Sequence, residues 1–186
     1  MATVRFVVWN AEWMNDLFTS DGDFHPDDRV VRGPNPRREN GQPNVKSRRE
    51  SLSSVIDEIS PDLIVIVEGP NKKDELQLFF DTDVAGTWKC DVQPSSGSSQ
   101  IIGLAVRTDT GKFADEPFVR FHIDEGIGGS GKLLADATNP FHIDTDDDDL
   151  KEVHKFERRP LYAQIELAGG KKFRIAGLHL KSKGIF

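Results

Sequence analysis

The sequence has very little cysteine and no long apolar run, and each absence excludes a class of protein. Cys90 is the single cysteine in the 186 residues, so the chain can form neither an internal disulfide nor a multi-cysteine zinc site. We expect Cys90 to be a reduced thiol on a strand. The longest apolar runs, such as Leu63–Val67, are far too short to span a bilayer.

A secretion signal and an excess of positive charge are also absent. The N-terminus enters the strand-like run TVRFVVW at once, without a basic region, a long apolar region or a small-residue cleavage site. This start predicts a cytoplasmic protein, and a mature secreted form would begin in the same way. The formal net charge of −7 argues against a protein that holds nucleic acid by overall charge. It leaves room for an enzyme that neutralises phosphates locally with metal ions and a few arginines.

The order of the predicted elements indicates an α/β fold in one domain. The segment TVRFVVW predicts a largely buried strand, and DLIVIVEG predicts a fully buried parallel strand. Between them, residues 47–60 have apolar residues at helical spacing, with Ser47 and Glu50 as an expected capping box and Pro61 as the stop. Strand, helix, strand is a crossover unit, so we expect both strands in one sheet.

The remainder of the chain predicts further strands separated by irregular insertions. We expect a helix at residues 72–80, a strand pair at 87–93 and 101–109, and a short strand at 118–124. Residues 158–167 and 171–180 should form a hairpin. The polar stretches near 15–46 and 125–154 are expected to be irregular, and long loops in compact domains are often functional.

Polar side chains follow three of the predicted strands, where open α/β sheets place their sites. These residues are Asn10, Glu68 and His179. A carboxylate directly after five apolar residues needs a partner, because an unpaired buried charge is costly. Carboxylate and amide oxygens are hard ligands, so the pattern predicts Mg²⁺, Mn²⁺ or Ca²⁺ rather than zinc.

Four motifs in order carry a resemblance to a known family. VVWNAEW, PDLIVIVEG, FERRPLYAQIEL and FRIAGLHLKSKG together resemble the endonuclease/exonuclease/phosphatase superfamily, in its deoxyribonuclease I-like branch. The resemblance implies an αββα sandwich that binds a divalent metal. It implies that Asn10 orients a metal-bound group, that Glu68 binds the metal and that His179 acts at the leaving group. It also implies that Arg158 contacts phosphate, with Arg159 as a rival because the register of that motif is loose.

The family pattern continues with an Asp-x-Asn motif, a further Asp and a final Asp-His pair. None follows in this chain, so the resemblance implies that residues 1–186 are the N-terminal half of one domain. The predicted function is a metal-dependent phosphodiester hydrolase, most simply a nuclease that takes nucleic acid as its substrate. One alternative is a phosphatase or phospholipase acting on inositol phosphates or sphingomyelin. Another is an incomplete half-domain that pairs with its missing C-terminal half as a second chain or self-associates.

Each candidate residue also has a plain structural interpretation. Asn10 could be a turn residue at a strand end, and Glu68 could be a solvated strand-end carboxylate. Taken alone, a histidine such as His179 is more often a hydrogen-bonded core residue. Arg158 and Arg159 alternate along a strand, so only one of them can face the site.

Overall fold

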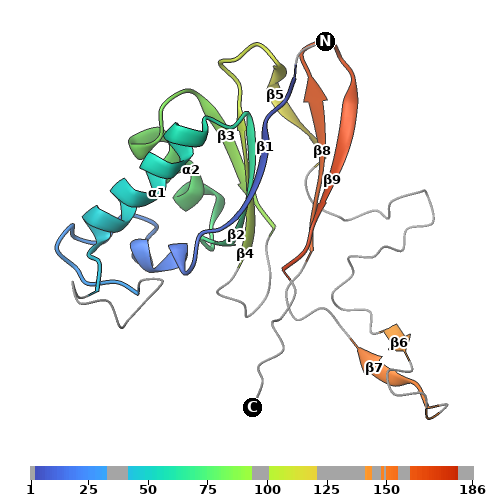
Figure 1. The fold of residues 1–186 in the computed structure, drawn as a ribbon, viewed down its shortest axis with the longest axis horizontal. Helices are drawn as coiled ribbons and strands as arrows, with labels where there is room; N and C mark the ends of the chain where they lie inside the picture. The colour runs from blue at the N-terminus through green and yellow to red at the C-terminus, as the bar shows by residue number, and fades with distance from the viewer. Residues whose placement is uncertain are drawn as a thin grey trace.

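The molecule is an α/β protein with two main sheets and few helices (Figure 1). The computed structural model describes residues 3–32, 42–93, 101–120, 141–143, 148, 150–154 and 160–179. The elements follow in the order β1 (Phe6–Asn10), η1 (Met14–Leu17), α1 (Val45–Ile59), β2 (Leu63–Gly69), α2 (Lys73–Asp83), β3 (Trp88–Val92), β4 (Ile101–Arg107), β5 (Phe113–Arg120), β6 (Phe141–Ile143), β7 (Glu152–His154), β8 (Leu161–Leu167) and β9 (Lys172–Gly177).

The larger sheet has the strand order β1-β2-β4-β3, and the second sheet has the order β5-β8-β9. β1 and β2 are parallel and are joined through α1, which confirms the predicted crossover unit. The β3–β4 pair and the β8–β9 hairpin are antiparallel, as expected. β2 is buried along its whole length, but it lies between one parallel and one antiparallel neighbour.

The continuous apolar run of β2 is explained by the layers on either side of it. α1 and α2 cover one face of the larger sheet, and the second sheet lies on the other face (Figure 1). Alternate side chains of a strand point to opposite faces. Ile64 and Ile66 therefore pack with the helices, while Leu63 and Val65 pack against the second sheet.

The start of α1 differs from the expected capping box. Asn44 is the N-cap, and its side chain accepts a hydrogen bond from the Ser47 N–H at 2.8 Å. The Ser47 hydroxyl in turn accepts from the Asn44 N–H at 3.1 Å. The prediction of Ser47 as the cap with Glu50 as its partner is therefore wrong. The helix begins earlier because Asn also caps well and supplies the reciprocal pair with serine.

The prediction that the first strand is largely buried is also wrong. β1 is the edge strand of its sheet, and Phe6 and Val8 are 51% and 63% exposed. Only Val7 and Trp9, which point to the helical face, pack against the buried core. The face of β1 that carries Phe6 and Val8 stays exposed because the described part of the second sheet does not reach over it.

Two further boundaries differ from the sequence prediction. The segment near 125–154 was expected to be irregular, but β6 and β7 pair within it as a short antiparallel ladder. β5 begins at Phe113, before the predicted strand, because Phe113 pairs with Leu167 and is buried between the sheets. Among the described residues, no helix is long and apolar enough to cross a membrane.

Cys90 lies on β3 and is buried, which confirms a free thiol on a strand. Burial raises the pKa of its thiol well above the usual range, and the negative charges of Asp81 and Asp91 act in the same direction. Because the thiolate is the reactive form, Cys90 belongs to the core and not to a reactive site.

Asp62 ties three elements together at the end of the sheet opposite the polar strand ends. Its carboxylate accepts the Arg5 N–H at 2.7 Å and lies 2.8 Å from the Lys112 ammonium. We expect Lys112→Met to lower the free energy of unfolding by about 2 kcal/mol, because it leaves a buried carboxylate without its cation. Urea unfolding would measure this, with Lys46→Met as the control. Lys46 makes only an exposed pair with Glu50, so that variant should change stability by less than about 0.5 kcal/mol.

Candidate active site at the strand ends

Asn10, Glu68 and His179 are brought to the same edge of the two sheets. Asn10 pairs with Val67 in the parallel ladder, and the Ala11 N–H donates to the Val67 carbonyl at 2.9 Å. Asn10 and Glu68 therefore leave neighbouring strands at the same end. His179 lies two residues beyond β9, and its Nε2 is 3.5 Å from Glu68 Oε1. The side chains of Glu68 and His179 are each only 11% exposed.

The backbone around Glu68 is unusual. Glu12, Trp13 and Glu68 have φ angles of 43°, 60° and 60°, which make three of the four positive-φ non-glycine residues in the described part of the chain. A non-glycine residue with positive φ is uncommon, and such residues cluster at functional sites where the surroundings hold them. Two of these residues are in direct contact: the Trp13 N–H lies 3.3 Å from Glu68 Oε2.

Asn10 has the turn role that was left open as an alternative. Its Oδ1 accepts the N–H of Glu12 at 2.8 Å, which is the local bond of an Asx turn. The side chain is exposed, and an amide oxygen has two lone pairs. Oδ1 can therefore hold the turn and still face a ligand.

Arg48 fixes the carbonyls of the strained segment from α1. Its Nη2 donates to the Ala11 carbonyl at 2.6 Å and lies 3.3 Å from that of Glu12. Burial lowers the pKa of Arg48, partly offset by the negative charge of Glu12. Arg48 has no signal in the sequence, because it acts on carbonyls 37 and 36 positions away and belongs to no motif.

We expect Arg48→Met to lower the free energy of unfolding by about 2 kcal/mol, because two carbonyls lose a charged donor. It should also weaken Mn²⁺ binding about tenfold, as loss of a residue supporting a metal ligand typically does. Urea unfolding and Mn²⁺ titration measure the two effects. The Arg48→Lys control keeps the charge and one donor and should lose less of both. Unchanged Mn²⁺ affinity in folded Arg48→Met would show that Arg48 only stabilises the fold.

The donor chemistry at this edge is compatible with a hard divalent cation. A carboxylate has about four lone-pair positions, and among the described residues one oxygen of Glu68 faces the Trp13 N–H and the other faces His179. Mg²⁺ usually takes one or two carboxylates and keeps several waters. Within the described ranges, no three His, Cys, Asp or Glu side chains form a metal-binding group. Among the described residues, Glu68 would be the anionic ligand of such a cation, with Asn10 beside it.

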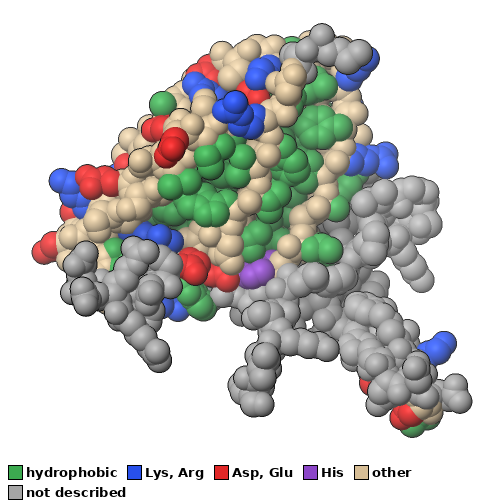
Figure 2. Space-filling view, viewed as in Figure 1, with side chains coloured by type: hydrophobic (Ala, Val, Ile, Leu, Met, Phe, Trp, Pro, Cys, Tyr) green, Lys and Arg blue, Asp and Glu red, His purple; other side chains and the backbone are tan. Residues whose placement is uncertain are grey.

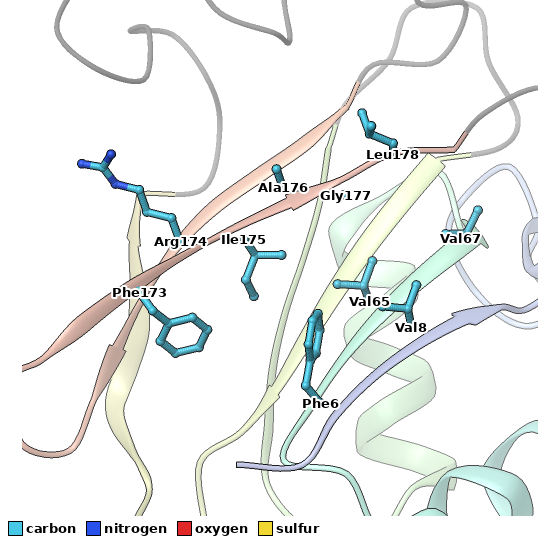
Figure 3. Close-up of a pocket in the computed structure, with 10 residues that line it drawn as sticks. All are labelled: Phe6, Val8, Val65, Val67, Phe173, Arg174, Ile175, Ala176, Gly177 and Leu178. Carbon is cyan, nitrogen blue, oxygen red and sulfur yellow. The ribbon is translucent and has the colours of Figure 1, made fainter. Parts of the chain in front are cut away.

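An apolar groove of about 500 Å³ runs beside these residues (Figures 2 and 3). It lies between β1 and β2 on one side and β9 on the other, and it is lined by Phe6, Val8, Val65, Val67, Phe173 and Ile175. Its end nearest the site is Leu178, which is 50% exposed and directly precedes His179. The described part of the molecule therefore has an uncovered apolar surface that reaches the polar strand ends.

Arg158 and Arg159, the two expected phosphate contacts, lie outside the described residues. Among the described residues, two other arginines approach the site. One is Arg48, and the second is Arg32, whose guanidinium lies over the Trp13 ring with its carbon 4.0 Å from the ring centre. Arg32 falls in the stretch that the sequence predicted to be irregular, and nothing local in the sequence marked it.

No protein-family model and no curated protein matches the chain. A solved structure matches 82% of this chain and 51% of its own, at 11% identity and a TM-score of 0.40. It is the crystal structure of a functionally unknown conserved protein from Enterococcus faecalis V583. The chain therefore spans about half the length of that protein. At this level of similarity, neither a fold family nor a function follows from the match.

Proposed function

We propose that the protein is a metal-dependent phosphodiester hydrolase, with a nuclease as the leading assignment. The observation that carries the proposal is the meeting of Glu68 and His179, at 3.5 Å, beside Asn10 and within a cluster of positive-φ residues. Glu12 and Trp13 lie in the turn between Asn10 and η1, and Glu68 lies at the irregularity of the β2–β4 ladder, so local turns and a bulge bring these three residues to the same place. The resemblance in four motifs supports the same assignment. The proposal includes a deoxyribonuclease I-like αββα sandwich as the fold of the complete domain.

In this proposal each residue has one role. Glu68 and Asn10 would hold Mg²⁺ or Mn²⁺, and a bound cation of this kind polarises a phosphoryl group and offsets its charge. The imidazole of His179 would hold a proton at the leaving oxygen while water attacks in line on the opposite side. Arg158, or Arg159 in its place, would bind a non-bridging oxygen as a fork.

A second candidate substrate is a phosphorylated lipid or a small phosphate ester. The observation that favours a lipid is the apolar groove, because Val67 and Leu178 line it and directly precede Glu68 and His179. The net charge of −7 also favours a substrate other than long nucleic acid. Both candidates share the same site and the same chemistry.

The groove also supports the proposal that this chain is half of a sandwich. Phe6 and Val8 on the edge strand present apolar side chains that a completed second sheet would cover. The partner would be the missing half as a second chain or another copy of this chain. Light scattering that shows a well-folded monomer with no tendency to associate would count against it.

Hydrolysis assays on a panel of substrates test the proposed function. Plasmid DNA, RNA, an inositol phosphate and sphingomyelin vesicles should be incubated with Mg²⁺, with Mn²⁺ and with EDTA. We expect EDTA-sensitive cleavage of DNA or RNA, whereas cleavage of only the inositol phosphate or the vesicles would select the second candidate. No cleavage of any of the four, by the chain alone or with its complementing half, would contradict the proposed function.

A further inference from the structure

Arg32 is held beside the candidate site by the segment that precedes α1. Val30 forms an antiparallel bridge with Asn44, and the Val31 N–H donates to the Pro43 carbonyl at 2.9 Å. These contacts anchor the segment to the start of the helix. The guanidinium of Arg32 then lies over the ring of Trp13, the residue whose N–H faces Glu68.

The orientation of the Arg32 guanidinium is fixed by two groups. Asp16 on η1 accepts hydrogen bonds from Nε and Nη2, one on each carboxylate oxygen. The Trp13 ring supports the flat face, which is a favourable cation–π geometry. The Arg32 side chain is nevertheless 51% exposed, so part of the fork is open to solvent. A planar fork fixed in this way is pre-organised for the oxygens of a phosphate.

The charges around the site favour an additional cation beside it. Glu68, Glu12 and Asp16 are acidic, and a phosphodiester brings a further negative charge to the same place. The hydrogen bonds that Arg32 donates to Asp16 raise the pKa of its guanidinium, and the negative charge of Glu68 adds a smaller effect in the same direction. Among the residues that the structure describes, Arg48 is the other cation near the site, and it is half-buried and directed at backbone carbonyls.

We infer that Arg32 is a substrate-binding residue of this site and holds a non-bridging oxygen of a phosphoryl group next to Glu68. The inference rests on the proposed function and extends it to a residue outside the four motifs. Asp16 and Trp13 act as positioning residues, because they orient the fork and leave its open part toward the substrate. A purely structural alternative is that Arg32 only ties its segment to η1.

Inorganic phosphate is a probe that separates these two roles. Because the guanidinium lies 4.0 Å from the centre of the Trp13 ring, phosphate bound at Arg32 should change tryptophan emission. We expect Arg32→Ala to weaken phosphate binding, measured with Mg²⁺ present, by about 10- to 100-fold, the loss typical of a charge-assisted hydrogen bond. Arg29→Ala is the matched control, because it removes the same charge from the same segment and Arg29 contacts only His25 among the side chains that the structure describes.

The steady-state rates on whichever substrate the wild type cleaves give a second measurement. Arg32→Ala should raise KM by a similar factor and change kcat less, whereas Arg29→Ala should leave both unchanged. Arg32→Lys keeps a positive charge facing Asp16 but loses the planar guanidinium. Its phosphate affinity and KM should therefore lie between those of the wild type and Arg32→Ala. This variant decides the question if Arg32→Ala does not fold.

The inference is overturned if phosphate does not perturb the wild type, or if folded Arg32→Ala matches Arg29→Ala in phosphate affinity or in KM. Its failure is distinguishable from failure of the proposed function. If the wild type cleaves nothing but binds phosphate, and Arg32→Ala binds phosphate more weakly, the anion site stands and the hydrolase proposal fails. If the wild type cleaves a substrate, and Arg32→Ala and Arg29→Ala have the same KM for it, the hydrolase proposal stands and Arg32 does not have this role.

Discussion

Glu68→Gln is expected to abolish metal-dependent hydrolysis, with a loss of at least about 10³-fold in kcat, because a carboxylate that holds a catalytic cation accounts for several kcal/mol of transition-state stabilisation. Glutamine keeps the size of the side chain and one oxygen acceptor. The Trp13 N–H can therefore still be satisfied, so the fold should persist. The rate should be measured on the substrate that the wild type cleaves best, with saturating Mg²⁺ or Mn²⁺.

Glu50→Gln is the control for this change. Glu50 is an exposed residue of α1 that pairs only weakly with Lys46, at 3.9 Å, so its neutral variant should keep full activity. The metal assignment would be wrong if Glu68→Gln retained wild-type, EDTA-sensitive cleavage. A loss of activity without any change in metal binding would point instead to Glu68 as a group that orients His179, which lies 3.5 Å away.

His179→Asn should lower kcat by about 10²- to 10⁴-fold, the contribution typical of a general acid or base, with a smaller change in KM. The reason is that the imidazole would supply the proton that the leaving oxygen needs. For a substrate whose leaving group departs without a proton, His179→Asn should lower kcat much less. The measurement is therefore a comparison of a natural phosphodiester with bis(p-nitrophenyl) phosphate, using the same two proteins.

His25→Asn is the matched control for the histidine. His25 lies in the loop before α1 and contacts Arg29, so its replacement should leave both substrates unaffected. An equal loss on the natural and the activated substrate would contradict a role for His179 at the leaving group. It would indicate that the histidine positions Glu68 or supports the strand end.

Local sequence pattern was sufficient for most elements of the fold. The apolar run of β2, the hairpin of β8 and β9 and the helical spacing of α1 were each visible within a short window. What could not be predicted depends on neighbours distant in sequence. The exposure of Phe6 and Val8 follows from β1 being an edge strand, and an edge strand has the same residue pattern as a covered one. The cap of α1 was misplaced because Asn44 and Ser47 are both good capping residues.

The sequence indicated the strand-end residues of the candidate site. It did not indicate the arginines that lie around them. Glu68 and His179 stand out because a polar residue directly follows or interrupts an apolar run. Arg48 acts on carbonyls 37 and 36 positions away, and Arg32 binds a carboxylate 16 positions away, so neither has a local signal. The positive φ of Glu12, Trp13 and Glu68 was equally invisible, because these residue types do not favour that conformation.

Mn²⁺ binding measured by electron paramagnetic resonance is the direct test of a divalent-cation site built on Glu68 at the strand ends. We expect one Mn²⁺ site in the wild type and in Glu50→Gln, and an affinity at least about tenfold lower in Glu68→Gln, because the bound cation loses its anionic ligand. Equal affinity in all three proteins would rule out a metal site at Glu68, because the cation would then be held somewhere else.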